Sequence, residues 1–168
     1  MAYFNIVPQS SESTVVTEYK PQAKRSEAYQ SETELEREFI RLLQELGYEY
    51  LPIHKEKDLV DNLRFQLETV NGYRFSDEEW GRFFSEVLAN PKSGIVEKTR
   101  LIQEDFVQVL RRDDGSSKNI TLFDKKNIHN NRLQVINQYT VSKEEGAAHD
   151  NRYDVTVLVN GLPMVHIE

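Results

Sequence analysis

The sequence of 168 residues contains no cysteine, which excludes disulfide bonds, thiolate zinc sites and a cysteine nucleophile. It has no run of about 18 apolar residues, which a membrane-spanning helix would need. The first residues, "MAYFNIVPQSSES", lack the basic segment and the long apolar segment of a secretory signal. Neither a P-loop nor another glycine-rich phosphate cradle occurs. These absences predict a cytoplasmic protein with no membrane partner.

The chain is acidic, with 28 aspartate and glutamate residues against 21 lysine and arginine residues and a net charge of −7. This balance argues against a surface that binds nucleic acid by bulk electrostatic attraction. It does not exclude a nucleic-acid enzyme, because a metal-dependent active site itself gathers carboxylates. A hydrophobic content of 38% is ordinary for a globular protein.

The pattern along the chain predicts an α+β fold, in which amino-terminal helices precede a mixed or antiparallel sheet. Residues 1–30 are rich in serine, glutamate, threonine and glutamine, and they predict an extended or partly disordered arm with one short strand. Residues 31–168 form the predicted domain. Its helices are expected at 31–46, 55–70 and 76–89, and its strands at 48–53, 119–123, 133–141 and on both sides of the turn at 159–163.

Capping signals support the first and third helices. Ser31 with Glu34, and Ser76 with Glu79, have the spacing of a capping box, and Gly47 is placed to end the first helix. The first helix carries one apolar stripe, which we expect to face the core: Leu35, Phe39, Leu42, Leu43 and Leu46. The stretch from 94 to 110 shows no clear period.

The last hairpin decides which acidic side chains share a face of the sheet. A two-residue loop at Asn160–Gly161 would place Asp154 and Glu168 on opposite faces, because side chains alternate along a strand. It would also bury Glu168 among valines, which is costly for an unpaired charge. A three-residue loop with Gly161 in the left-handed conformation reverses the parity and is therefore predicted. One face is then apolar, with Tyr153, Val155, Val157, Val159, Val165 and Ile167, and the other carries Asp154, Thr156, His166 and Glu168.

Two carboxylates on neighbouring strands are a usual scaffold for a hard divalent cation such as Mg²⁺. A water bound to the metal can act as the nucleophile, while the metal stabilises charge on phosphorus. A solvated strand face is the other interpretation of the same pair. The four histidines lack paired metal-ligand spacing, so His166 is expected to be structural or to support the ligands. The basic, amide-rich run "DKKNIHNNR" at 124–132 predicts a solvated loop, with a phosphate-backbone contact as the alternative.

The segment "NRYDVTVLVNGLPMVHIE" at 151–168 resembles the D…ExK core of the PD-(D/E)XK nucleases, and more narrowly the nuclease segment of type I restriction enzyme R subunits. Two further segments, "SETELEREFIRLLQELGYEYL" and "KNIHNNRLQVINQY", resemble the amino-terminal region of the same family. The resemblance covers the chain from about Ser31 onward. It implies a restriction-endonuclease-like domain over 31–168, incomplete at its carboxyl end.

The resemblance implies that Asp154 and Glu168 are metal ligands and catalytic residues of a DNA-cleaving site that uses Mg²⁺. It places a catalytic lysine two positions after Glu168, so we expect a fragment that was cut before this lysine and is inactive by itself. Such nucleases often add a carboxylate from the first helix. Glu32 is the first candidate on the helical wheel, and Glu36 is the second.

The implied whole enzyme cleaves double-stranded DNA and assembles with specificity and methyltransferase subunits of a restriction-modification complex. Binding of ATP is implied only for a translocating motor region that these residues do not include. Two other functions stay open. One is a docking or regulatory module without metal affinity, and the other is a PD-(D/E)XK nuclease of a DNA-repair system without an ATP-driven motor.

Overall fold

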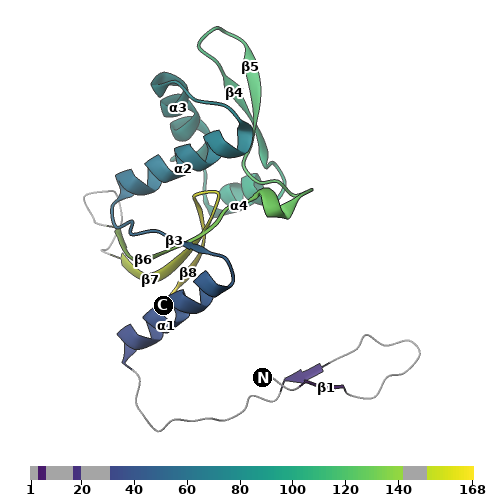
Figure 1. Ribbon diagram of the computed structural model, residues 1–168. Helices are drawn as coiled ribbons and strands as arrows, with labels where there is room; N and C mark the ends of the chain where they lie inside the picture. Colours follow the sequence, from purple (N-terminus) through teal and green to yellow (C-terminus); the bar gives the residue numbers. More distant parts are fainter. Residues whose placement is uncertain (1–3, 7–16, 20–30, 142–150) are drawn as a thin grey trace. The chain divides into compact units, whose positions relative to one another are not determined.

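The computed structural model describes the backbone of residues 4–6, 17–19, 31–141 and 151–168, and side chains from 31 to 140 and from 154 to 168. The chain divides into two compact units, residues 1–34 and residues 35–168. In the first unit, the short strands β1 (Phe4–Ile6) and β2 (Thr17–Tyr19) pair in antiparallel fashion (Figure 1). The arm thus contains two short strands where one was predicted, and the remainder of that prediction lies outside the described residues.

The predicted helices are confirmed within a few residues of their expected bounds. A fourth helix and one π-helical turn were not predicted. The helical elements are α1 (Glu32–Glu45), α2 (Glu56–Asn71), α3 (Asp77–Phe83), the π-helical η1 (Phe84–Leu88), α4 (Ile95–Gln103) and the 3₁₀ turn η2 (Ile128–Asn130). No helix in the described part of the chain has the length and apolar character needed to cross a membrane.

Both predicted capping boxes are present. At α1, the Ser31 N–H donates to Glu34 Oε2 (2.9 Å) and the Glu34 N–H donates to Ser31 Oγ (3.3 Å). At α3, the Ser76 N–H donates to Glu79 Oε2 and the Glu79 N–H donates to Ser76 Oγ, each at 3.1 Å. These pairs satisfy backbone N–H groups that the first helical turn leaves without intrahelical partners.

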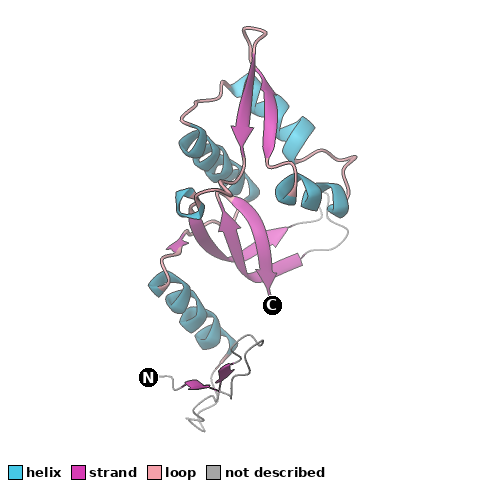
Figure 2. Cartoon of the chain, turned by 90° about the vertical axis from the view of Figure 1, so that its right-hand side faces the viewer, coloured by secondary structure: helices cyan, strands magenta, loops and turns pink. Residues whose placement is uncertain are grey.

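The main sheet is mixed, as the sequence predicts, and has the order β3-β6-β7-β8. The short β3 runs parallel to β6, whereas β6, β7 and β8 form an antiparallel meander (Figure 2). A separate hairpin of β4 and β5 follows α4 in sequence. The strand bounds are β3 (Glu49–Tyr50), β4 (Val107–Arg111), β5 (Ser117–Thr121), β6 (Leu133–Val141), β7 (Asn151–Val159) and β8 (Leu162–Ile167).

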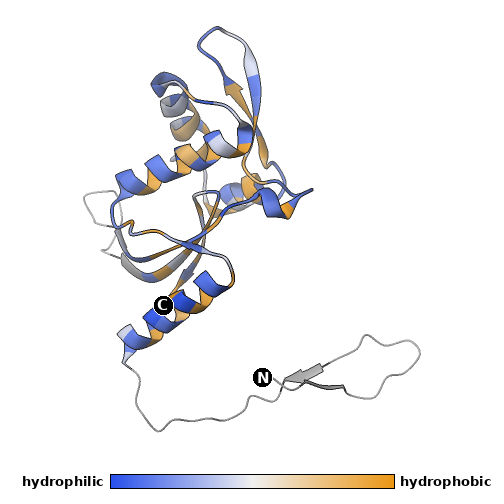
Figure 3. Ribbon diagram, in the orientation of Figure 1, coloured by the Kyte–Doolittle hydropathy of each residue, from blue (hydrophilic) through white to orange (hydrophobic). Residues whose placement is uncertain are grey.

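Both faces of the main sheet are covered. Successive residues of β6 point to opposite sides of the sheet, and each side packs against a helix. Val135 packs with Ile40 of α1, and Ile136 packs in a cluster that Leu59 of α2 joins. Figure 1 shows α1 and α2 on opposite sides of the sheet, and Figure 3 shows apolar residues along both helices.

The packing face of α1 differs from the predicted stripe. Ile40 is buried, and Phe39 and Leu43 are partly buried against the sheet. By contrast, Leu35, Leu42 and Leu46 are 52%, 44% and 74% exposed. The buried stripe is therefore narrower than the apolar pattern, and only Phe39 and Leu43 of the five predicted residues pack against the sheet.

The loop of the last hairpin also differs from the prediction. Val159 pairs directly with Leu162, so the loop has two residues. Asn160 and Gly161 have φ values of 51° and 81°, the left-handed pair of a type I′ turn. The predicted change of parity nevertheless occurs, because Leu158 pairs with Pro163 whereas Val157 pairs with Val165. Met164 is therefore the extra residue of a bulge in β8, which turns the later side chains to the predicted faces.

The turn itself is buried between α2 and the loop before β6. The Asn160 side chain is fully buried and donates from Nδ2 to the Leu122 carbonyl and to Asn131 Oδ1, both at 2.9 Å. Its Oδ1 accepts from the Arg132 N–H at 2.8 Å. Gly161 approaches the backbone of Leu63 so closely that an added Cβ would lie 2.6 Å from Leu63 Cα. The hairpin end is thus held by α2 and by both ends of the loop that joins β5 to β6, all of which are distant from it in sequence.

A buried carboxylate joins α3 to the β4–β5 hairpin. Glu79 is 4% exposed, and its Oε1 accepts from the Asp113 N–H at 3.1 Å. Its Oε2 accepts from the Tyr73 hydroxyl at 2.8 Å in addition to the capping bond from Ser76. Burial raises the pKa of Glu79, but the hydrogen bonds from Tyr73, Ser76 and Asp113 outweigh burial and leave this pKa below its ordinary value.

Gly161→Ala should destabilise the fold more than Gly115→Ala. Both glycines have a φ of 81°, where an L-residue costs about 1–2 kcal/mol. Only at Gly161 would the new methyl group meet the α2 backbone, which adds about 1–3 kcal/mol of overpacking. Urea unfolding of the two variants measures the difference. Equal losses of stability would show that the contact between the turn and α2 is unimportant.

Glu79→Gln should lower the free energy of unfolding at pH 7 by about 2 kcal/mol, because it removes a hydrogen-bonded buried charge. A carboxyl whose pKa is lowered on folding stabilises the protein above the unfolded-state pKa, and this contribution is lost as the pH falls through the folded-state pKa. The variant should therefore lose less stability than the wild type when the pH falls from about 5 to about 3. Thermal unfolding across this range measures the effect, and Glu78→Gln, on the same helical turn but exposed, is the control.

Candidate functional site

The candidate site lies where β7 begins and β8 ends. Thr156 pairs with His166 and Val155 pairs with Ile167 in the register beyond the bulge. Continuing this register by one residue places Asp154 opposite Glu168, on the face that carries Thr156 and His166. The two acidic residues are therefore on one face and on neighbouring strands, as the sequence predicted, although the bulge rather than the loop brings this about.

The pair next to the two acids is joined by a hydrogen bond. Thr156 Oγ1 and His166 Nδ1 are 2.9 Å apart, and Thr156 is 1% exposed. Burial lowers the pKa of His166 below its ordinary value, and the charge of Glu168 opposes this shift. His166 is thus held against Thr156 beside Glu168, which agrees with a supporting place at the edge of the site.

The second helix candidate, Glu36, is held over β6 by two side-chain amides. Its Oε1 accepts from Asn137 Nδ2 and its Oε2 accepts from Gln138 Nε2, each at 2.5 Å. The Tyr50 hydroxyl donates in turn to Asn137 Oδ1 at 2.8 Å. Both oxygens of the Glu36 carboxylate therefore have fixed partners on the sheet.

Gln138 occupies an unusual backbone position beside the acids. Its φ of 54° is rare for a residue other than glycine, and the β6–β7 pairing skips from Asn137–Val155 to Tyr139–Tyr153. The same register places Gln138 opposite Asp154. A sparsely allowed conformation persists only where its surroundings stabilise it, and here the bond to Glu36 contributes.

Glu32, the first helix candidate, is exposed in the first turn of α1, within the unit of residues 1–34. Among the described residues, no three histidine, aspartate or glutamate side chains gather closely enough to hold a metal ion. The geometry thus pairs Asp154 with Glu168 and bonds Glu36 of α1 to side chains of β6, without uniting three acids. Two carboxylates fit an ion such as Mg²⁺, which keeps several waters and often takes only one or two carboxylate ligands. The assignment of Asp154, Glu168 and Glu32 as catalytic stays a prediction.

Asn137 and Gln138, which hold Glu36, were not predicted from the sequence. In "LQVINQYTV", two apolar residues and then two amides stand side by side, which breaks the alternation of an ordinary half-buried strand. Such a break is the available signal for a strand distortion. The partner of the two amides could not be read from it, because Glu36 lies about a hundred positions earlier in the chain.

Residues 29–168 match the model of the protein family described as "Type I restriction enzyme R protein N terminus". A relative from Escherichia coli, the type I restriction enzyme EcoprrI endonuclease subunit, is 45% identical over 163 residues, which cover 96% of this chain and 51% of the relative. The chain therefore spans about half the length of that relative.

Staphylococcal relatives are much longer than the chain. The type I restriction enzyme SauMSSORF170P endonuclease subunit of Staphylococcus aureus is 38% identical over 146 residues, which cover 84% of this chain and 15% of the relative. The type I restriction enzyme SsaAORF53P endonuclease subunit of Staphylococcus saprophyticus is 37% identical over 145 residues, which cover 83% of this chain and 15% of the relative. With its helices, its mixed sheet and this match over most of its length, the chain belongs to the type I restriction enzyme R protein family and corresponds to the amino-terminal region of that family.

Proposed function

We propose that the chain supplies the endonuclease part of a type I restriction enzyme R subunit, which cleaves double-stranded DNA with the aid of Mg²⁺. The observation that carries this proposal is the β7–β8 register, in which Val155 pairs with Ile167; continued by one residue, it sets Asp154 opposite Glu168 on one face of the sheet. The relatives are named as endonuclease subunits of type I restriction enzymes, which supports the proposal.

Asp154 and Glu168 would hold the metal, and both offer the oxygen atoms that Mg²⁺ prefers. When bound, the ion supplies an activated water and stabilises the charge that develops on phosphorus. His166, tied to Thr156, keeps the neighbouring part of this face in place beside Glu168. The covered sheet beneath gives these side chains a rigid base, which site geometry requires.

Glu36 is the better supported helix carboxylate for this function. Its two oxygens are oriented by Asn137 and Gln138, and Gln138 is opposite Asp154 in the β6–β7 register. Because α1 packs on the face of Val135 and Val155, whereas Asp154 and Glu168 lie on the other face, Glu36 would act on the site through Gln138. Partners of this kind orient the ligands of a metal and tune its affinity.

The whole protein would couple cleavage to ATP-driven translocation by a motor outside these residues. It would act in the cytoplasm, together with specificity and methyltransferase subunits. The family pattern places its lysine at position 170, two residues beyond Glu168, so we propose that these 168 residues bind the metal but do not cleave DNA alone. Metal binding is therefore the property to measure on this chain.

Mn²⁺ or Mg²⁺ should raise the unfolding temperature of the wild type, because an ion that binds only the folded state stabilises it. At a metal concentration of about 100 times the Kd, the gain is about 2.7 kcal/mol. Asp154→Asn and Glu168→Gln should each lose most of this gain. Calorimetric titration with Mn²⁺ should show the same loss of affinity.

The control is Asp105→Asn, which removes one exposed acidic charge at a distance in sequence from the site. Comparing each variant with and without metal cancels its own change in stability. If Asp154→Asn and Asp105→Asn respond equally to the metal, or if the wild type does not respond, the pair is a solvated strand face. The docking-module interpretation would then replace the nuclease.

Glu36→Gln should weaken Mn²⁺ binding about tenfold, the lower range for loss of a group that orients metal ligands. Glu38→Gln is the matched control, because Glu38 lies on the same helix but is exposed and pairs with Arg41 of that helix. Calorimetric titration of both variants compares the two positions. Equal affinities would remove Glu36 from the site and leave Asp154 and Glu168 alone.

A further inference from the structure

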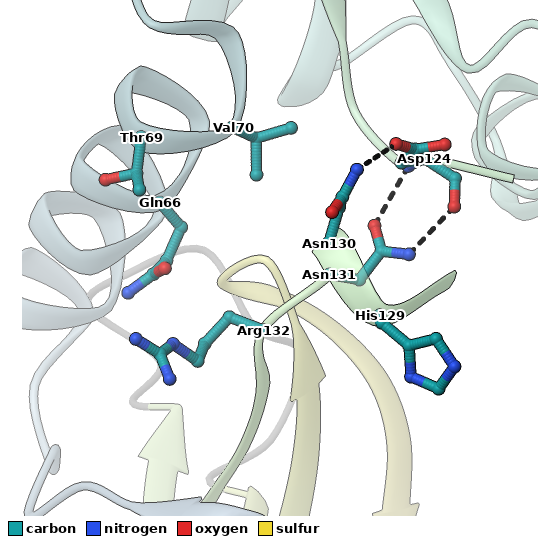
Figure 4. A pocket seen from close by; sticks show the side chains of 8 residues that line it. All are labelled: Gln66, Thr69, Val70, Asp124, His129, Asn130, Asn131 and Arg132. Atoms are coloured by element: carbon teal, nitrogen blue, oxygen red, sulfur yellow. Dashed lines mark hydrogen bonds between the residues drawn. The ribbon is translucent and has the colours of Figure 1, made fainter. Parts of the chain in front are cut away.

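A polar groove lies between the second half of α2 and the loop that joins β5 to β6. Its volume is about 460 Å³. Figure 4 shows Gln66, Thr69 and Val70 of α2 on one side and Arg132, Asn130 and His129 on the other. Seven of the eight residues that line it are polar, with Val70 as the exception. Such a lining does not suit an apolar ligand.

The loop at 124–132 is held in one conformation by its own side chains. Asp124 Oδ1 accepts from the N–H groups of Lys126 (3.0 Å) and Asn127 (2.8 Å), and Asp124 Oδ2 accepts from Asn130 Nδ2 (2.7 Å). Asn131 bonds to both backbone polar groups of Asp124 at 2.9 Å. These bonds, some of which are drawn in Figure 4, engage the Asp124 carboxylate within the loop. They lower the pKa of Asp124, and the bond from the Asn127 N–H has the largest effect.

The same loop carries several basic side chains, of which Arg132 is the one beside the groove with a charged head group. Residues 124–132 carry Lys125, Lys126 and Arg132 against the single acid Asp124, in a chain whose net charge is −7. Arg132 is 65% exposed, and its Nε reaches Glu49 Oε2 only at 3.9 Å. Lys125 bonds to the Gln103 carbonyl, whereas Lys126 and His129 are exposed. Arg132 and the amide side chains line the groove itself, while Lys126 lies outside it in the same loop. Because the one carboxylate in the lining, Asp124, is engaged within the loop, these donors favour an anion over a metal ion.

The opposite wall is a buried amide network that cannot rearrange freely. Gln66 is 6% exposed and donates from Nε2 to Asn62 Oδ1 at 3.3 Å. Asn62 donates to Gln134 Oε1 at 3.0 Å, and Gln134 donates to Glu49 Oε2 at 3.2 Å. Glu49 is the same carboxylate that faces Arg132. A chain of polar contacts therefore runs from one wall of the groove to the cation on the other.

We infer that this groove binds a phosphodiester group of DNA and so positions the duplex for the site at Asp154 and Glu168. The inference rests on the proposed function, because it supplies a second contact for the same substrate. Asn160, which is bonded to the loop, is six residues from Asp154 along β7, or about 20 Å. This distance corresponds to about six base pairs of duplex. A phosphate contact there would orient DNA without reading its sequence.

The test measures the binding of a labelled DNA duplex of about 30 base pairs to the 168-residue chain. Fluorescence anisotropy reports the binding, in EDTA and over a range of salt concentrations. Arg132→Ala should reduce the salt slope of log K by about 0.9 and weaken binding about fivefold at low salt. Arg132→Lys should keep most of the slope, because it keeps the charge. Arg74→Ala removes an exposed arginine elsewhere and should leave the slope unchanged.

Equal effects of Arg132→Ala and Arg74→Ala would overturn the inference, since bulk charge alone would then explain binding. No binding of the duplex by the wild type at low salt would overturn it too. Inorganic phosphate that displaces the duplex better than chloride of equal ionic strength would assign the groove to free phosphate instead. Calorimetric titration of wild type and Arg132→Ala with Mn²⁺ measures the metal site separately, so failure at the metal site and failure at the groove are distinguishable.

Discussion

The buried turn at Asn160 and Gly161 is the constraint on which the arrangement of the sheet depends. Gly161 approaches the backbone of α2, while Asn160 bonds to the loop before β6. The two-residue turn alone would have placed Asp154 and Glu168 on opposite faces. The bulge at Met164 shifts the register by one residue and brings both acids to one face. Turn and bulge together thus determine which chemistry the hairpin can present.

Amide side chains of β6 connect the sheet to the helices on its two faces. Asn137 and Gln138 hold Glu36 of α1, and Gln134 joins α2 to β3. Buried amides of this kind stabilise one arrangement when their donors and acceptors are satisfied. In the described part of the chain, no buried side-chain nitrogen or oxygen is without a hydrogen-bond partner. The left-handed Gln138, which is opposite Asp154 in the β6–β7 register, is therefore stabilised by its bond to Glu36.

Much of the fold could be predicted from local patterns. Both capping boxes and the three predicted helices follow from short-range spacing, and the structure has them. The exposed side of α1 and the existence of α4 could not be predicted from such patterns. Whether Leu42 is buried depends on how the helix lies on its sheet, and residues 94–110 mix a helix with a strand. Local periodicity contains no information on either.

The sequence by itself determined which residues alternate along β7 and β8, and hence that the valine face and the acidic face must each be continuous. It also determined the family, through segments spread over most of the chain. Only the tertiary structure decided how parity is restored, because a bulge inside β8 and a longer loop have the same effect on the pattern. It also decided that Glu36 meets the sheet, since its amide partners come from a distant strand. Contacts between segments so far apart depend on packing, which no local spacing encodes.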